Sequence, residues 1–277
     1  MRFDDQGFLA QAYSTDEQLA VRIETHRRYG VNPKDLFEAI TEQALSRSRP
    51  ARILDVGAGN GSWYRALRRV LGPEPQYVGL DQSAGMVERL QEEIAGDARA
   101  AARTGDAQAL PWTEPQFDWV GMHFMLYHVP DIRRAIGEAW RVLSPGGLLL
   151  AATTSPTPYS ELLDVLVEGL REMGYAAQAI AYPAERFSLA QGGAFFPAPV
   201  EKFVFPAGFR FDAVEPALRY LASGPLDVAI AQAGAPAAVR GDLVRYVGER
   251  VAVEIAQRGS FLASAQSGFF LLAKPAV

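Results

Sequence analysis

A glycine-rich turn with acidic residues around it is the strongest chemical signal in the chain. The stretch "ILDVGAGNG" places Asp55 just before Gly57, Gly59 and Gly61. Glycine lets the backbone approach a ligand closely, and a helix that starts after such a turn presents free N–H groups. Asp81 ends the next predicted strand, where its carboxylate can accept hydrogen bonds from a ribose diol. We therefore expect a nucleotide-like ligand at this turn.

The spacing of these glycines differs from that of a dinucleotide-binding turn. The fingerprint G-x-G-x-x-G/A ends on a glycine or an alanine, but this chain has Ser62 at that position. A carboxylate at Asp55 repels a pyrophosphate but binds an ammonium group, directly or through water. Asp106 follows the third predicted strand and faces an adenine amino group in this interpretation. The residues therefore favour a ligand with ribose, adenine and a cationic amino-acid tail over NAD, and over a purely structural turn.

A parallel sheet is needed to bring these side chains to one edge. From Ala51 onward, short apolar runs alternate with helical patterns. Repeated strand–helix units are typical of a doubly wound α/β sheet, in which ligands bind at the carboxyl ends of the strands. The predicted strands are 52–57, 77–81, 99–106, 117–124 and 148–155, and the predicted helices are 62–71, 83–94 and 131–143.

The remaining segments are expected to complete the sheet and to cover it. Asn32-Pro33 opens a predicted helix, with the proline at the first helical position. Residues 201–206 and 267–274 are predicted strands, and 259–266 form a segment that can pair with the second of them. We expect an N-terminal helical cap over 1–50, a ligand-binding core over 51–155, a lid insertion over 156–199, and the rest of the core sheet and its helices over 200–277.

The composition excludes several classes of function. The chain has no cysteine, which excludes disulfides, zinc–thiolate sites and thiol nucleophiles. Its formal net charge is −5 without a dense cluster of lysine and arginine, so no nucleic-acid surface is expected. The N-terminus lacks the apolar stretch of a signal peptide and no run is long enough to cross a membrane, so we expect a cytoplasmic protein. Three scattered histidines do not make a metal site.

Ordered motifs across residues 51–155 resemble the class I methyltransferases that use S-adenosylmethionine (SAM). The motifs are "LDVGAGNG", "VGLDQSAGM", "GDAQALPW", "FDWVGMHFMLYHVPD" and "RVLSPGGLLLAATTS". Within that class the chain is similar to the ubiquinone/menaquinone-biosynthesis-like group (methyltransferase domain 11/25 type), which includes many small-molecule methylators. The resemblance implies a Rossmann-like α/β fold, with a seven-stranded sheet of order 3-2-1-4-5-7-6, an antiparallel last strand and a helical lid.

The same resemblance implies an activity and assigns the residues that hold SAM. The expected reaction transfers a methyl group from SAM to an oxygen, nitrogen or carbon atom of a small organic acceptor and releases S-adenosylhomocysteine (SAH). The implied contacts are Asp55, Gly57, Ala58 and Gly59 for the amino-acid end, Asp81 for the ribose, Gln82 and Met86 for the adenine, Asp106 and Ala107 for the adenine edge, His123 and Phe124 for the methionine portion, and Tyr13 as an aromatic that closes over the cofactor or simply packs.

Candidate acceptor residues come from three parts of the chain. His128 lies in "MHFMLYHVPD", after the fourth predicted strand, and is the candidate base or acceptor hydrogen-bond partner; alternatively it fixes the loop before Pro130. The other candidate acceptor contacts are His26, Tyr29, Tyr127 and Tyr159, with a solvated helix face or simple lid packing as the alternative. Two other functions stay open, a methyltransferase acting on tRNA or rRNA and a SAM-binding protein without catalysis.

Overall fold

The chain divides into two compact units, which share the strands of one sheet. The structure, a computed structural model, describes residues 16–32, 34–180 and 183–276. The core unit comprises Lys34–Pro156, Arg186–Phe205 and Ser267–Val277, and the helical unit comprises Met1–Pro33, Thr157–Glu185 and Pro206–Gln266. Residues 156–199 therefore contribute to both units, since the division falls between Glu185 and Arg186.

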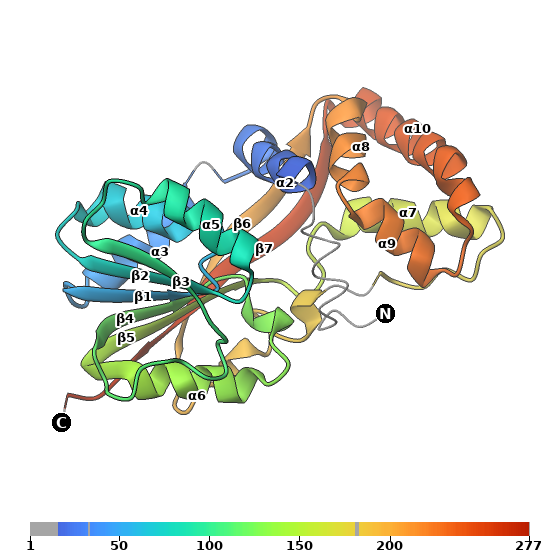
Figure 1. The fold of residues 1–277 in the computed structure, drawn as a ribbon. Coiled ribbons are helices and arrows are strands. Elements are labelled where there is room, and N and C mark those ends of the chain that lie inside the picture. The colour runs from blue at the N-terminus through green and yellow to red at the C-terminus, as the bar shows by residue number, and fades with distance from the viewer. Residues whose placement is uncertain (1–15, 33, 181–182, 277) are drawn as a thin grey trace. The chain divides into compact units, whose positions relative to one another are not determined.

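Seven strands among the described residues form one sheet of order β3-β2-β1-β4-β5-β7-β6 (Figure 1). Strands β1 to β5 are parallel to one another, and β7 is antiparallel to β5. The predicted strand order and the antiparallel strand are thus confirmed. The strands are β1 (Arg52–Val56), β2 (Gln76–Asp81), β3 (Ala100–Thr104), β4 (Phe117–Met122), β5 (Leu143–Thr154), β6 (Glu201–Phe211) and β7 (Phe261–Ala273).

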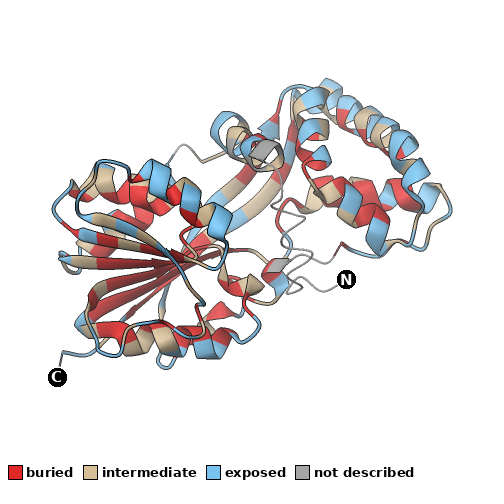
Figure 2. Cartoon of the chain, in the orientation of Figure 1, coloured by how far each residue is buried: buried red, intermediate tan, exposed pale blue. Residues whose placement is uncertain are grey.

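Helices cover both faces of the sheet in the core unit. Strands β1 and β4 are almost entirely buried, as expected for central parallel strands, and they form the red centre of the sheet in Figure 2. Trp63 and Leu67 pack with Ile53 on one face, and Ile136 packs with Leu54 on the other. The first face carries α3 (Leu36–Leu45), α4 (Ser62–Leu71) and α5 (Ala84–Glu93), and the second carries α6 (Ile132–Val142); the short 3-10 helices are η1 (Leu126–His128) and η3 (Gly192–Phe195).

Helix α3 begins later than the sequence predicted. The expected start was Pro33, but the helix begins at Leu36. The carboxylate of Asp35 accepts hydrogen bonds from the amides of Phe37 and Glu38, at 2.8 and 3.4 Å. A side-chain acceptor at the N-cap satisfies amides that lack a partner within the helix, so Asp35 sets the boundary.

The C-terminal residues form one long strand instead of the expected pair. The two expected segments meet between residues 266 and 267, but β7 runs through this position without a turn. A Cβ added at Gly268 would lie 2.0 Å from the carbonyl oxygen of Phe203. The glycine therefore allows β6 to approach closely, and it does not mark a hairpin.

The helical unit has a separate hydrophobic core. Its helices are α2 (Asp16–Tyr29), α7 (Ser160–Glu172), α8 (Val214–Ala222), α9 (Pro225–Gln232) and α10 (Arg240–Arg258), with 3-10 helices η2 (Pro183–Glu185) and η4 (Ala237–Val239). Leu162 and Leu166 lie on the buried face of α7, where they pack in one cluster with Val247 of α10 and Phe209 of β6. No helix in the described part of the chain is long and apolar enough to cross a membrane.

Candidate functional site

The glycine loop is attached to the end of β2. The amides of Gly57 and Ala58 both donate to the carbonyl of Leu80, at 2.7 and 3.1 Å. The amide of Gly59 donates to a carboxylate oxygen of Asp81 at 3.0 Å. The loop after β1 and the acid that ends β2 therefore form one rigid corner at the carboxyl edge of the sheet, where doubly wound folds bind ligands.

Two glycines shape this corner in different ways. Gly57 has φ +70°, and a Cβ added there would lie 2.7 Å from Cγ of Met125, so the loop after β4 presses against it. Gly59 has φ +53°, and an added Cβ would meet no atom within 4 Å. Among the described residues, none therefore fills the space beside Gly59.

The amino end of α4 carries no side-chain cap. The N-cap residue Gly61 makes no side-chain hydrogen bond. The other core-unit α-helices are capped by Asp35, Ser83 and Asp131, each of which accepts main-chain hydrogen bonds. The first amides of α4 therefore have no side-chain acceptor from the N-cap, and the helix dipole favours a negatively charged group there.

The carboxyl ends of β2 and β3 place the predicted ribose and adenine contacts along the same edge. Asp81 is partly buried, accepts a second hydrogen bond from the amide of Ser83 at 2.9 Å, and has its pKa raised mainly by burial. Asp106 is exposed and accepts from the amide of Gln108 at 2.8 Å, which fixes the turn after β3. Of the remaining predicted contacts in this region, Gln82 is exposed, Met86 is partly buried and Ala107 is buried.

Asp55 is buried and has a partner that the sequence analysis missed. Its side chain is 2% exposed, and it accepts a hydrogen bond from the hydroxyl of Tyr77 at 2.9 Å. Burial raises the pKa of Asp55 to about 7, against the lowering effect of the Tyr77 hydrogen bond. Because burial makes this carboxyl costly to ionise, a cation nearby would stabilise its charged form. Tyr77 precedes Asp81 by four positions in the same strand, and no local motif marks it as a partner.

His123 lies in an aromatic environment at the end of β4. Its ring centroid is 4.4 Å from that of Trp63 and 5.7 Å from that of Phe37. Neither ring nitrogen has a hydrogen-bond partner among the described residues. Burial lowers the pKa of His123 to about 3, so the imidazole is neutral at physiological pH. A neutral, desolvated ring can line a pocket, or donate or accept a hydrogen bond, but it is a poor base.

The loop after β4 carries the other candidate residues of the core unit. Phe124 adopts φ +54°, a left-handed conformation that is rare for a bulky side chain. Tyr127 and His128 follow in η1, both partly buried, with ring centroids 4.6 Å apart. These residues share the core unit with the glycine loop, and Met125 of the same segment contacts Gly57.

Three predicted acceptor residues belong to the helical unit. The hydroxyl of Tyr159 is 3.5 Å from Nε2 of His26, so two residues 133 positions apart meet. The ring of Tyr159 stacks on Phe209 with centroids 4.6 Å apart, and the His26 ring meets Phe209 edge-on at 4.8 Å. Tyr29 packs on Phe211 instead, at 5.3 Å. Tyr13, the other aromatic that we predicted, lies outside the described residues.

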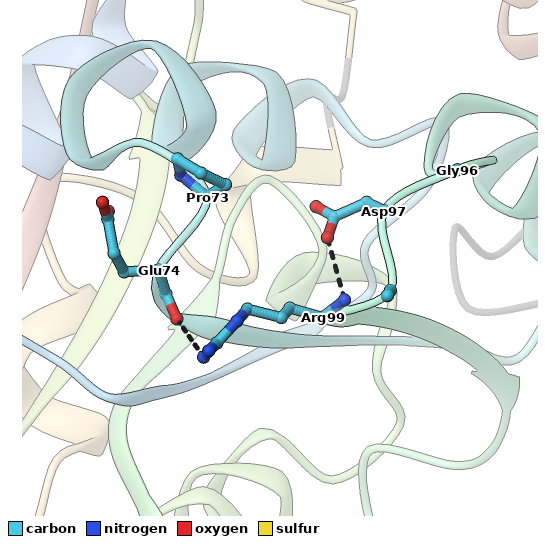
Figure 3. Close-up of a pocket in the computed structure, with 6 residues that line it drawn as sticks. Pro73, Glu74, Gly96, Asp97 and Arg99 are labelled. Atoms are coloured by element: carbon cyan, nitrogen blue, oxygen red, sulfur yellow. Dashed lines mark hydrogen bonds between the residues drawn. The ribbon is translucent and has the colours of Figure 1, made fainter.

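A shallow pocket lies at the opposite edge of the sheet (Figure 3). Its walls are the loops before β2 and β3, with Pro73, Glu74, Gly96, Asp97 and Arg99. Figure 3 shows that its polar groups bond to one another: the Arg99 guanidinium donates to the carbonyl of Glu74 at 2.8 Å, and its amide donates to Asp97 at 2.9 Å. The pocket is therefore separate from the corner formed by the glycine loop.

Comparison with known proteins finds similarity in the central part of the chain. Residues 53–147 match the model of the methyltransferase domain family. Demethylmenaquinone methyltransferase from Staphylococcus aureus is 38% identical over 104 residues. The alignment spans 38% of this chain and 43% of that enzyme, so it covers less than half of the relative.

Solved structures of other proteins share the fold. The YcgJ protein from Bacillus subtilis aligns with a TM-score of 0.52 at 20% identity, over 86% of this chain and 97% of that one. A phosphoethanolamine N-methyltransferase 2 from Haemonchus contortus, solved with SAM, aligns with a TM-score of 0.55 at 18% identity, over 99% of this chain and 60% of that one. The chain therefore has the Rossmann-like fold of class I methyltransferases.

Proposed function

We propose that this protein is a SAM-dependent methyltransferase that transfers a methyl group to an oxygen, nitrogen or carbon atom of a small organic acceptor. The observation that carries the proposal is the corner in which Asp81 binds the Gly59 amide beside the uncapped amino end of α4. The match of residues 53–147 to the methyltransferase domain family supports it.

The residues at this corner fit the chemical groups of SAM. Asp81 offers carboxylate lone pairs to the ribose hydroxyls, and the first amides of α4 suit the carboxylate of the amino-acid end. Asp55 supplies negative charge for the ammonium group. The adenine would lie along Gln82, Met86, Asp106 and Ala107, and the methionine portion beside Gly57, Ala58, Gly59, His123 and Phe124, with Tyr13 as a further candidate contact.

The protein's task in this reaction is mainly to position and to desolvate. SAM supplies an electrophilic methyl group on a good leaving group, so the acceptor atom needs to be held in line with it and kept from water. His128, in the loop that touches the glycine corner through Met125, is the residue we assign to the acceptor's proton. Because His123 is neutral and buried, it lines the pocket in this proposal and takes no proton.

In the core unit, Tyr127 is the proposed acceptor contact. In the helical unit, taken by itself, Tyr159, His26 and Tyr29 are the candidate acceptor contacts. The pair of Tyr159 and His26 combines a hydroxyl, an imidazole and the face of Phe209, which suits a planar acceptor with one polar substituent. The net charge of −5 favours such a small molecule over tRNA or rRNA.

The test is to incubate the full chain with methyl-labelled SAM and candidate acceptors, and to analyse the products by mass spectrometry. Quinone-type acceptors come first, since the curated relatives that match the chain are demethylmenaquinone methyltransferases. A fractionated metabolite extract extends the search to other small molecules. We expect one labelled product and stoichiometric SAH. Tight SAM binding without any labelled product would instead indicate a SAM-binding protein without catalysis.

A further inference from the structure

Arg186 links the loop after β4 to the part of residues 156–199 that belongs to the core unit. Its guanidinium donates hydrogen bonds to the carbonyl oxygens of Tyr127, Val129 and Pro130, at 3.0, 3.0 and 3.1 Å. These carbonyls lie at the end of η1, where the last oxygens of a helical turn lack partners within it. A guanidinium offers several donors in fixed directions and keeps its charge, so it can satisfy all of them together.

Arg186 is itself held in place by its neighbours along the chain. Phe187 is fully buried in the core unit, and its carbonyl accepts a hydrogen bond from the hydroxyl of Thr153 at 2.7 Å. Two residues on, the amide of Leu189 donates to the carbonyl of Thr154 at 3.0 Å. The backbone that carries Arg186 is thus attached to the end of β5. Through its three hydrogen bonds, the arginine attaches the end of η1 to the same part of the sheet.

The segment that Arg186 binds contains a strained residue. Phe124 has φ +54°, and such a conformation persists only where surrounding contacts fix it. Its amide donates to the carbonyl of Ala152 at 2.9 Å, and the amide of His128 donates to the carbonyl of Met125 at 2.9 Å. These bonds hold the start and the middle of the segment, while the three bonds from Arg186 hold its end.

The position of this segment determines one wall of the glycine corner. The side chain of Met125 fills the space that a Cβ at Gly57 would need. A shift of residues 124–130 would therefore move Met125 away from the glycine loop and change the shape of the corner.

We propose that Arg186 is a positioning residue, which holds residues 124–130 against the glycine loop through its three main-chain hydrogen bonds. Its effect on the shape of the segment is independent of any ligand. Its effect on cofactor affinity rests on the proposed function, because it assumes that SAM and SAH bind at the glycine corner.

The test compares Arg186→Gln and Arg186→Lys with the wild-type full chain. Amide hydrogen exchange, read by mass spectrometry on peptides that cover residues 124–130, should be faster by about tenfold in Arg186→Gln. Arg186→Lys should give a smaller increase, since an ammonium keeps the charge but loses the planar set of donors. SAH titrated into each protein well below its unfolding temperature should bind about three- to tenfold more weakly in Arg186→Gln.

The matched control is an arginine that lies away from residues 124–130. Arg99→Gln removes the same charge and a main-chain hydrogen bond, to the carbonyl of Glu74 at 2.8 Å, in the same unit but in the loop before β3. Exchange over 124–130 and SAH affinity should stay at wild-type values in this variant. A purely structural Arg186 would lower the unfolding temperature and leave SAH affinity in the folded protein unchanged.

The possible outcomes separate the two proposals. Wild-type exchange over 124–130 in both Arg186 variants would overturn the positioning role; if Arg186→Gln does not fold, Arg186→Lys alone decides. A wild-type chain that binds no SAH would contradict the proposed function, while the exchange measurement would still decide the role of Arg186.

Discussion

The carboxylate of Asp81 accepts the amide hydrogen of Gly59 at 3.0 Å, which fixes the glycine loop to the adjacent strand. Its second oxygen accepts from the amide of Ser83 at 2.9 Å. Both oxygens of one side chain thus organise main chain on either side of the proposed ribose position, and they retain lone pairs for the ligand.

Asp81→Ala should weaken SAH binding by about a hundredfold or more, because charge-assisted hydrogen bonds to the ribose and the support of the loop are lost together. Isothermal titration calorimetry measures the change. Asp118→Ala is the matched control: its carboxylate also accepts from two amides, those of Ala51 and Arg52 at 2.7 and 2.9 Å, but at the amino end of β1. Equal affinity in Asp81→Ala and wild type would contradict the cofactor site proposed here.

Gly59→Ala should affect binding more than stability. The positive φ costs an alanine about 1 kcal/mol, and the new methyl group enters open space on the proposed ligand side. Gly96→Ala carries the same backbone penalty, since Gly96 has φ +87° and no atom within 4 Å of an added Cβ, but it lies away from the corner. Urea unfolding should show similar losses for both variants, and only Gly59→Ala should lose SAH affinity; a loss in both would contradict the assignment.

The stability of the ligand-free protein should depend on pH through Asp55. Its folded pKa is about 7 against a usual value of 3.8, so the folded state binds the proton more tightly than the unfolded state. The free energy of unfolding should therefore fall as pH rises from about 4 to about 7, by on the order of a few kcal/mol, and level off above.

Asp55→Asn should remove this part of the pH dependence, as measured by urea unfolding across the same range. Tyr77→Phe removes the hydrogen bond that favours the carboxylate, so it should extend the fall to higher pH. A cationic ligand beside Asp55 favours ionisation, so SAM binding near pH 6 should release protons, which calorimetry in buffers of different ionisation enthalpy detects. The same pH profile in Asp55→Asn and wild type would assign the dependence to another group.

His128→Asn should reduce turnover while leaving the affinity for SAH unchanged. If the imidazole takes the acceptor's proton, kcat should fall by about a hundredfold or more. The measurement is steady-state kinetics with the acceptor found by mass spectrometry, together with SAH titration of the same preparation. Full activity would leave His128 with the structural role of fixing the loop before Pro130.

Much of the fold was predictable because its signals are local. The strand runs and the helix patterns between residues 52 and 154 each lie within a few residues, and the structure has a strand or helix at every one of them. The predicted start of α3 was wrong. Both Pro33 and Asp35 are typical of a helix start, and the helix begins after Asp35, whose side chain caps it. The continuous β7 was missed because its strand partners, β5 and β6, lie far from it in the chain.

The candidate site shows the same division between local and distant information. The loop and Asp81 follow from spacing along two consecutive strand ends. The pairing of Asp55 with Tyr77 depends on how β1 and β2 align, and the contact of His26 with Tyr159 joins segments far apart in the chain. Arg186 has no motif around it, since its partners are main-chain oxygens, which every residue carries.

The helical unit is built from three separate stretches of chain, and strands β6 and β7 continue from it into the core unit. No single cut releases it as an independent fragment, because its buried core draws on the N-terminal helix, the insertion and the C-terminal helices together. Replacing the helical unit with that of another protein would consequently require the exchange of three segments in one step, with the strand registers of β6 and β7 preserved.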